Sequence, residues 1–94
     1  MKNVVWSARA SRNVADIAAM VFDYAGEHSA ARYVAEFNRL VDLAAANPNM
    51  GKIGLANTRE LYPLNGKYRI VYEVAGDDLN VLAVKPSQML HETV

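Results

Sequence analysis

The sequence predicts an α+β domain in the order β-α-α-β-β-β, with a helical hairpin packed on one face of an antiparallel sheet. Two observations predict this class. Apolar residues recur at helical spacing through much of the first half, and the second half alternates short β-type runs with turn residues. Strands joined by tight turns pair antiparallel, and helices joined by a short break form a hairpin. The 94 residues fit one domain, which we expect to span 1–94.

The first half of the chain contains one expected strand and two expected helices. The run NVVWS is rich in bulky and β-branched residues and predicts the strand, and its Ser7 is suited to cap the helix that follows. Apolar stripes at helical spacing predict helices over residues 8–25 and 30–46. Gly26 ends the first helix and Ser29 can cap the second. So short a connection makes the pair antiparallel.

Three strands are expected in the second half. Pro48 stops the second helix, and the segment NPNMGKIGLAN around it is rich in turn residues. The strands are expected at residues 58–62, 67–74 and 79–85, with LNG and AGDD as the turns between them. The order of these elements favours hairpin pairing throughout this part of the sheet.

Alternation along the middle strand assigns its two faces, because side chains two residues apart share a face. One row is Tyr68, Ile70 and Tyr72, and the other is Arg69, Val71 and Glu73. We expect the apolar row to pack against the helices. Arg69 is then expected on the exposed face, where a ligand or a partner can reach it.

Composition excludes several classes of protein. Without cysteine the chain has neither disulfides nor a thiolate metal site, and its two histidines lie far apart, so we expect no metal and no cofactor. No apolar run approaches the roughly 20 residues of a membrane span, so a cytoplasmic protein is expected. Ten basic and ten acidic side chains cancel, which weighs against a broad phosphate-binding surface but leaves room for a local basic cleft.

Three segments of the chain follow one another in the order, and with the lengths and predicted elements, of a known protein family. They are VVWSARASRNVADIAAMVFDY, LAAANPNMGKIG and TRELYPLNGKYRIVYEVAGDDLNVLAV. Over nearly the whole chain they resemble the RelE/ParE superfamily of bacterial type II toxin–antitoxin systems. The resemblance implies a small cytoplasmic growth inhibitor neutralised by a cognate antitoxin. It leaves two mechanisms open, because ParE-like members act on DNA gyrase and RelE-like members cut messenger RNA on the ribosome.

The nuclease mechanism needs a group that activates the 2′-hydroxyl, a donor for the leaving oxygen, and cations on the phosphate. If this alternative holds, the resemblance gives as catalytic candidates Arg59, Arg69, Lys85 and His91. Each also has a plainer interpretation. Arg59 and neighbouring Glu60 can belong to a cross-strand ion pair, Arg69 can pair with Glu73, and His91 can be a bystander in the tail.

The final strand departs from the pattern of many relatives, which continue with a histidine and an arginine. Here the stretch is VKPSQML, in which Lys85 is the only cation and Pro86 stands where the histidine often falls. We therefore favour a ParE-like toxin that binds a protein target such as DNA gyrase. A RelE-like, ribosome-dependent mRNA endonuclease and a degenerate, non-toxic relative are the alternatives.

A cognate antitoxin is the expected partner under each alternative. Such antitoxins commonly wrap the toxin with a helix or an extended segment that orders on binding. The expected contact surfaces are the outer groove of the helical hairpin and an exposed sheet edge. The free protein is expected to aggregate or to form a homodimer.

Overall fold

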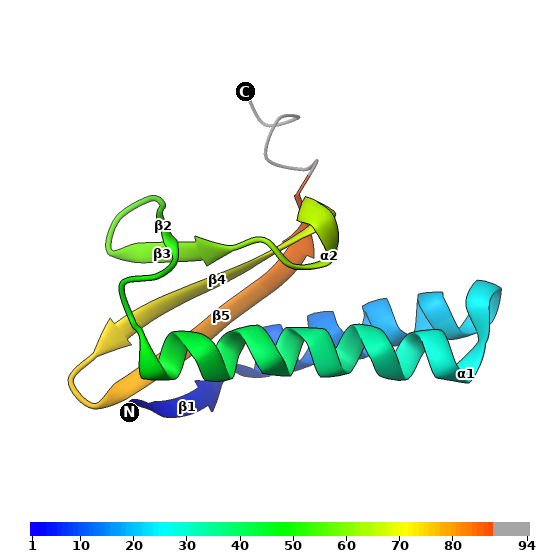
Figure 1. The fold of residues 1–94 in the computed structure, drawn as a ribbon, viewed down its shortest axis with the longest axis horizontal. Coiled ribbons are helices and arrows are strands. Elements are labelled where there is room, and N and C mark those ends of the chain that lie inside the picture. Colours follow the sequence, from blue (N-terminus) through cyan, green and yellow to red (C-terminus); the bar gives the residue numbers. More distant parts are fainter. Residues whose placement is uncertain (88–94) are drawn as a thin grey trace.

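Five strands and two helical segments make up residues 1–87, the part of the chain that the computed structural model describes. In chain order they are β1 (Asn3–Trp6), α1 (Ala8–Ala46), β2 (Lys52–Ile53), β3 (Thr58–Leu61), α2 (Pro63–Gly66), β4 (Tyr68–Ala75) and β5 (Asp78–Pro86). The strands form one sheet in the order β1-β5-β4-β3-β2, and α1 lies along its lower side in Figure 1. The predicted α+β class is confirmed.

The sheet is mixed, which corrects the expectation of a wholly antiparallel one. β1 pairs parallel with β5, with Asn3 opposite Asp78 and Trp6 opposite Val81, whereas every other neighbouring pair is antiparallel. The reason lies in the connection: β1 leads into α1, and a strand reached through a helical crossover need not reverse direction as a hairpin does.

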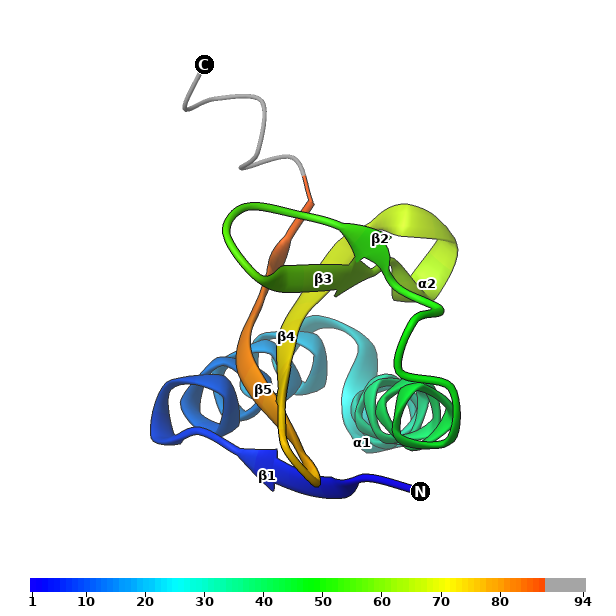
Figure 2. The same cartoon turned by 90° about the vertical axis from the view of Figure 1, so that its left-hand side faces the viewer.

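α1 consists of two antiparallel arms, residues 8–25 and residues 27–46, that run side by side in Figures 1 and 2. Gly26 separates them with φ 89° and ψ 175°, a conformation that glycine adopts without the clash of a Cβ. The expected four-residue break is thus one residue long, and Ser29 lies inside the second arm instead of capping it. Ser7 caps the first arm as expected, since its Oγ accepts a hydrogen bond from the Ala10 amide at 2.9 Å.

The core lies between α1 and one face of β4 and β5. Tyr68, Ile70 and Tyr72 are buried, as the alternation predicts. The ring of Tyr68 meets those of Phe37 and Tyr33 edge to face, with centroids 5.8 and 6.1 Å apart. Each such aromatic pair contributes about 0.5–1.5 kcal/mol beyond the area it buries, so these rings fix the second arm on β4.

Two short elements lie where the sequence predicts only turns. β2 pairs antiparallel with β3 and is two residues long, too short to show alternation. α2 takes the place of a tight turn between β3 and β4. Inside it Leu64 and Asn65 have φ of 56° and 57°, a left-handed conformation in which leucine is uncommon.

Candidate functional site

Arg69 and Lys85 are cross-strand neighbours on the sheet face that carries Arg69, Val71 and Glu73, here called the open face. Arg69 is ion-paired with Glu60 of β3: Nη1 lies 3.1 Å from Oε2, and the two side chains are 14% and 12% exposed. The partner is thus Glu60 and not the expected Glu73. Much of the positive charge of Arg69 is compensated within the sheet.

Tyr62 extends this network. Its hydroxyl donates a hydrogen bond to Oε1 of Glu60 at 2.5 Å, so the carboxylate of Glu60 accepts from Tyr62 on one oxygen and from Arg69 on the other. The hydrogen bond to Glu60 is the main cause that raises the pKa of Tyr62, and partial burial is the second. Both raise this pKa because they favour the neutral phenol. The result is a line of three linked side chains across the β3 end of the open face.

Lys85 stands in a different electrostatic environment. Partial burial is the main cause that lowers the pKa of its ammonium, and the positive charges of Arg9 and Arg69 lower that pKa further. Lys85 is therefore held near two other cations, one of which already has a carboxylate partner.

Arg59 lies on the opposite face of the sheet from Arg69 and Lys85. Its cross-strand partner is Tyr72, and its Nη1 donates to the carbonyl oxygens of Gly51 at 2.8 Å and Asn49 at 3.2 Å. The Tyr72 hydroxyl donates to the Pro48 carbonyl at 2.7 Å and accepts from the Gly51 amide at 3.1 Å. Together these two side chains hold the loop of residues 48–51 in place. We call Arg59 and Tyr72, with the backbone groups of the loop that they bind, the loop clamp.

The four residues predicted for a nuclease site are therefore not gathered into one site within the described chain. Arg69 and Lys85 are neighbours, and Arg59 serves the loop clamp on the other face. His91 lies outside the described residues. What the open face offers chemically is one ion-paired arginine and one lysine with a lowered pKa.

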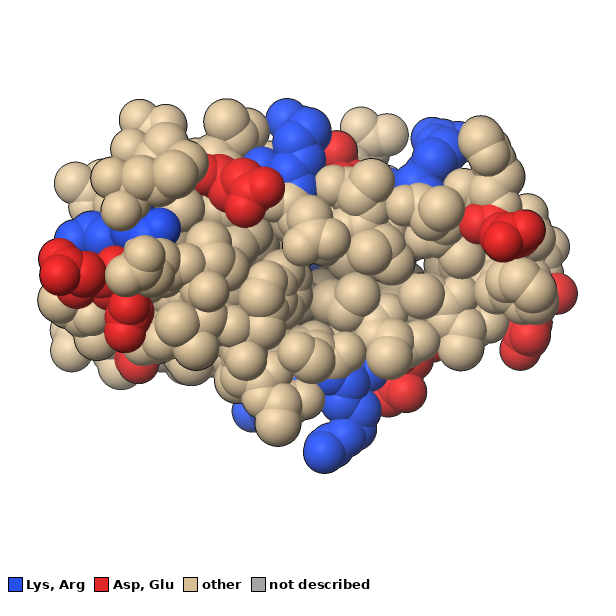
Figure 3. All heavy atoms as spheres, turned by 90° about the horizontal axis from the view of Figure 1, so that it is seen from below, with Lys and Arg blue, Asp and Glu red and all other residues tan. Residues whose placement is uncertain are grey.

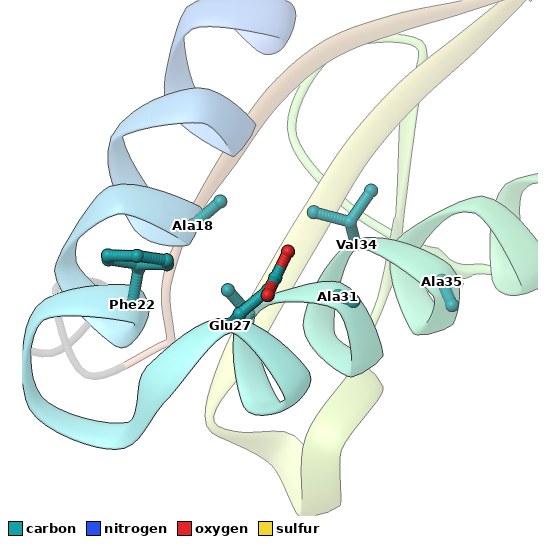
Figure 4. A pocket seen from close by; sticks show the side chains of 7 residues that line it. Ala18, Phe22, Glu27, Ala31, Val34 and Ala35 are labelled. Atoms are coloured by element: carbon teal, nitrogen blue, oxygen red, sulfur yellow. The ribbon is translucent and has the colours of Figure 1, made fainter.

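A groove runs between the two arms of α1. One part of it, a hollow of about 510 Å³, is lined by Ala18, Phe22, Glu27, Ala30, Ala31, Val34 and Ala35. Figure 4 shows Ala18 and Val34 pointing into the space between the arms, with Glu27 near the bend. Alanines predominate in this lining, so the groove stays open where larger side chains would fill it. The sequence predicts a groove on the hairpin, but only the packing of the arms identifies these residues.

The surface around the groove is largely uncharged. Figure 3 views the molecule from the side of α1, and uncharged residues fill the middle of that face while charged ones lie toward its rim. Phe22 is 55% exposed and Tyr24 is 70% exposed near the bend. An exposed apolar surface with a polar rim is typical of a site that binds a protein.

Residues 1–87 lack two features, a metal-binding cluster and a membrane-spanning helix. These residues contain no cluster of three or more side chains suited to bind a metal ion. Nor do they contain a helix whose length and apolar character would let it cross a membrane.

Comparison with known proteins identifies the class to which this fold belongs. The family model described as "ParE toxin of type II toxin-antitoxin system, parDE" matches residues 4–91, and the chain belongs to this family of the RelE/ParE superfamily. Among solved structures, it is similar to "Chromosomal ParDE TA system from P. aeruginosa", with a TM-score of 0.80 and 18% identity over 92% of this chain and 96% of that chain. At this identity the likeness concerns the fold alone. A comparison with curated proteins finds no match.

Proposed function

We propose that this toxin inhibits growth in the cytoplasm by binding a protein target, with DNA gyrase as the family expectation, and that a cognate antitoxin neutralises it. The observation that carries the proposal is that Arg59 is separated from the other candidate cations, Arg69 and Lys85. Arg59 is bound to two backbone carbonyls on one face, while Arg69 on the other face is bound to Glu60. RNA cleavage needs several cations and a proton-transferring group around one phosphate, and this distribution favours a binding mechanism.

The experiment that tests the mechanism compares two cellular responses after induction. We expect a DNA-damage response with intact messages. The variant Glu60→Gln/Arg69→Met removes the ion pair from the open face without leaving an unpaired charge, and it should retain toxicity. Codon-positioned RNA 5′ ends that disappear in this variant would overturn the proposal in favour of the nuclease. Normal growth after induction of the wild-type chain would favour a degenerate, non-toxic relative.

The groove between the arms is the proposed docking site of an antitoxin helix. Its position between the two arms and its largely apolar lining, in which Glu27 is the one charged residue, suit the apolar face of an amphipathic helix. A second part of the antitoxin can add to the β2 edge, where Ile53 is 73% exposed and Leu55 in the following turn is 86% exposed. Without the antitoxin these apolar surfaces are exposed to solvent. The free protein is therefore expected to associate with itself.

A matched pair of variants tests the docking site. Ala31→Glu places a charge in the groove, whereas Ala19→Glu places the same charge on an exposed part of the first arm outside the lining. A peptide containing the helix of the antitoxin encoded beside this toxin should raise the melting temperature of the wild type and of Ala19→Glu. It should leave that of Ala31→Glu nearly unchanged. Equal increases in all three proteins would exclude the groove as the docking site.

A further inference from the structure

A further hollow lies at the edge of β5, beside the start of α1. It measures about 380 Å³ and is lined by Arg9, Asn13, Asp16, Ile17, Val84, Lys85 and Pro86. Its position follows from the topology: β1 ends at Trp6, so the last residues of β5 have no strand on that side. The first arm lies there instead, and Oδ1 of Asn13 accepts a hydrogen bond from the Val84 amide at 3.0 Å.

The charges around this hollow do not balance. Arg9 and Lys85 are cations, and Asp16 is the one acidic residue in the lining, so one positive charge is left over. Within residues 1–87, the ion pairs closer than 4.0 Å join Glu36 to Arg39 and Glu60 to Arg69. Within the described residues, neither Arg9 nor Lys85 is therefore held in an ion pair, and the hollow keeps one positive charge in excess.

The start of α1 increases the positive potential. Its first turn has no acidic residue, and Arg9 and Arg12 lie close to the end where backbone amides carry partial positive charge. The lowered pKa of Lys85 is consistent with this environment, since Arg9 and Arg69 contribute to it after burial. An anion placed here would gain most from the two cations that line the hollow, Arg9 and Lys85.

We infer that the hollow binds the carboxylate of an aspartate or glutamate presented by a protein partner, between Arg9 and Lys85. A single carboxylate matches the single uncompensated charge. A nucleic acid brings a series of phosphates, and a single excess positive charge offers little to such a series. The apolar atoms of Ile17, Val84 and Pro86 give an apolar neighbour of the acidic residue a surface to contact. This inference goes beyond the proposed function, since it concerns a contact that can be measured without any cellular target.

The test is a titration of the isotope-labelled protein followed by NMR. The probe is the capped peptide N-acetyl-Leu-Glu-Leu-amide, and the matched control is the same peptide with glutamine. We expect the glutamate peptide to shift the amide signals of Arg9, Val84 and Lys85 and to bind several-fold more tightly than the control. Binding should also raise the pKa of the Lys85 ammonium, because the carboxylate offsets the repulsion from Arg9 and Arg69.

Variants of opposite expected sign separate recognition from a loss of folding. Lys85→Met should weaken binding about tenfold, about 1.4 kcal/mol, whereas Asp16→Asn should strengthen it by removing the opposing charge. Lys67→Met, which removes an exposed lysine outside the hollow, should change nothing. Equal binding of the two peptides, or unchanged binding in Lys85→Met, would overturn the inference. Tighter binding of a ten-nucleotide oligouridine through the same residues would also overturn it, since the hollow would then be a nucleic-acid site.

Discussion

Arg59 and Arg69 lie on adjacent strands of one sheet, yet their surroundings differ in kind. Arg59 belongs to the loop clamp on the helix-facing side and donates to two backbone carbonyls. Arg69 belongs to the open face and pairs with a carboxylate that also accepts from Tyr62. The first arginine holds the chain's own loop, and the second is balanced by a neighbouring charge.

This difference shows how strand pairing, more than residue type, decides what an arginine can do. The pairing of Arg59 with Tyr72 directs its side chain to the loop that Tyr72 also holds. The pairing of Arg69 with Lys85 brings two cations together, and Glu60 offsets one of them. A family position occupied by arginine therefore does not by itself define a catalytic group.

The largest effect is expected from breaking the ion pair on the open face. Arg69→Met leaves the carboxylate of Glu60, 12% exposed, with only the Tyr62 hydroxyl as a partner. We expect the free energy of unfolding to fall by about 2–3 kcal/mol, somewhat less than for a fully buried pair. Urea denaturation at neutral pH measures it.

The double variant Glu60→Gln/Arg69→Met is the control for that experiment. It removes both charges and keeps an acceptor for Tyr62, so its stability should return to within about 1 kcal/mol of the wild type. A double variant no more stable than Arg69→Met would show that the methionine itself disturbs the sheet. The ion pair would then not be the cause.

Removal of one hydroxyl from the loop clamp is expected to have the next largest effect. Tyr72 is fully buried, and in Tyr72→Phe the Pro48 carbonyl and the Gly51 amide lose their partner. The expected loss of stability is about 2 kcal/mol, the cost of leaving a buried amide and a part-buried carbonyl without their partner. Tyr24→Phe, at a position 70% exposed, is the matched control and should change stability little. Equal effects of the two variants would contradict the proposed role of this hydroxyl.

The loop clamp and the open face also differ in how far the sequence predicts them. The alternation along β4 correctly places Tyr72 in the core and Arg69 on the other face, because that pattern is complete within one strand. The face of Arg59 depends on the register between β3 and β4. That register is set by α2, a turn with left-handed residues that the sequence does not reveal.

The parts of the fold that were not predicted have the same origin. The direction of β1 is decided by its packing against β5, on the far side of a helical crossover. The hairpin was expected from its two apolar stripes, but the groove lining depends on how closely the arms approach. Contacts distant in sequence fix both features, and no local pattern encodes them.

A smaller and more local effect is expected from the arginine of the loop clamp. Arg59→Met removes the bonds to Asn49 and Gly51 but leaves those of Tyr72, so stability should fall by about 1 kcal/mol. Hydrogen exchange should accelerate at the amides of residues 49–51 and remain slow in β4. Toxicity per folded molecule should persist. Its loss in a variant with normal folding would assign Arg59 a direct role at the target and would remove the distinction between the two arginines.

The smallest effect is expected from pH at the open face. The pKa of Tyr62 is raised because its bond to Glu60 and its partial burial favour the neutral phenol, although Arg69 acts slightly in the opposite direction. The bond should therefore contribute its full stability below the ordinary tyrosine pKa of about 10 and lose it as pH rises through the higher folded value. Between these two values the unfolded chain has already lost the proton that the folded chain retains. Denaturation from pH 8 to 11 should show a steeper fall for the wild type than for Tyr62→Phe, with Tyr24→Phe following the wild type. Parallel curves for the wild type and Tyr62→Phe would mean that the link from Tyr62 to Glu60 does not stabilise the folded chain.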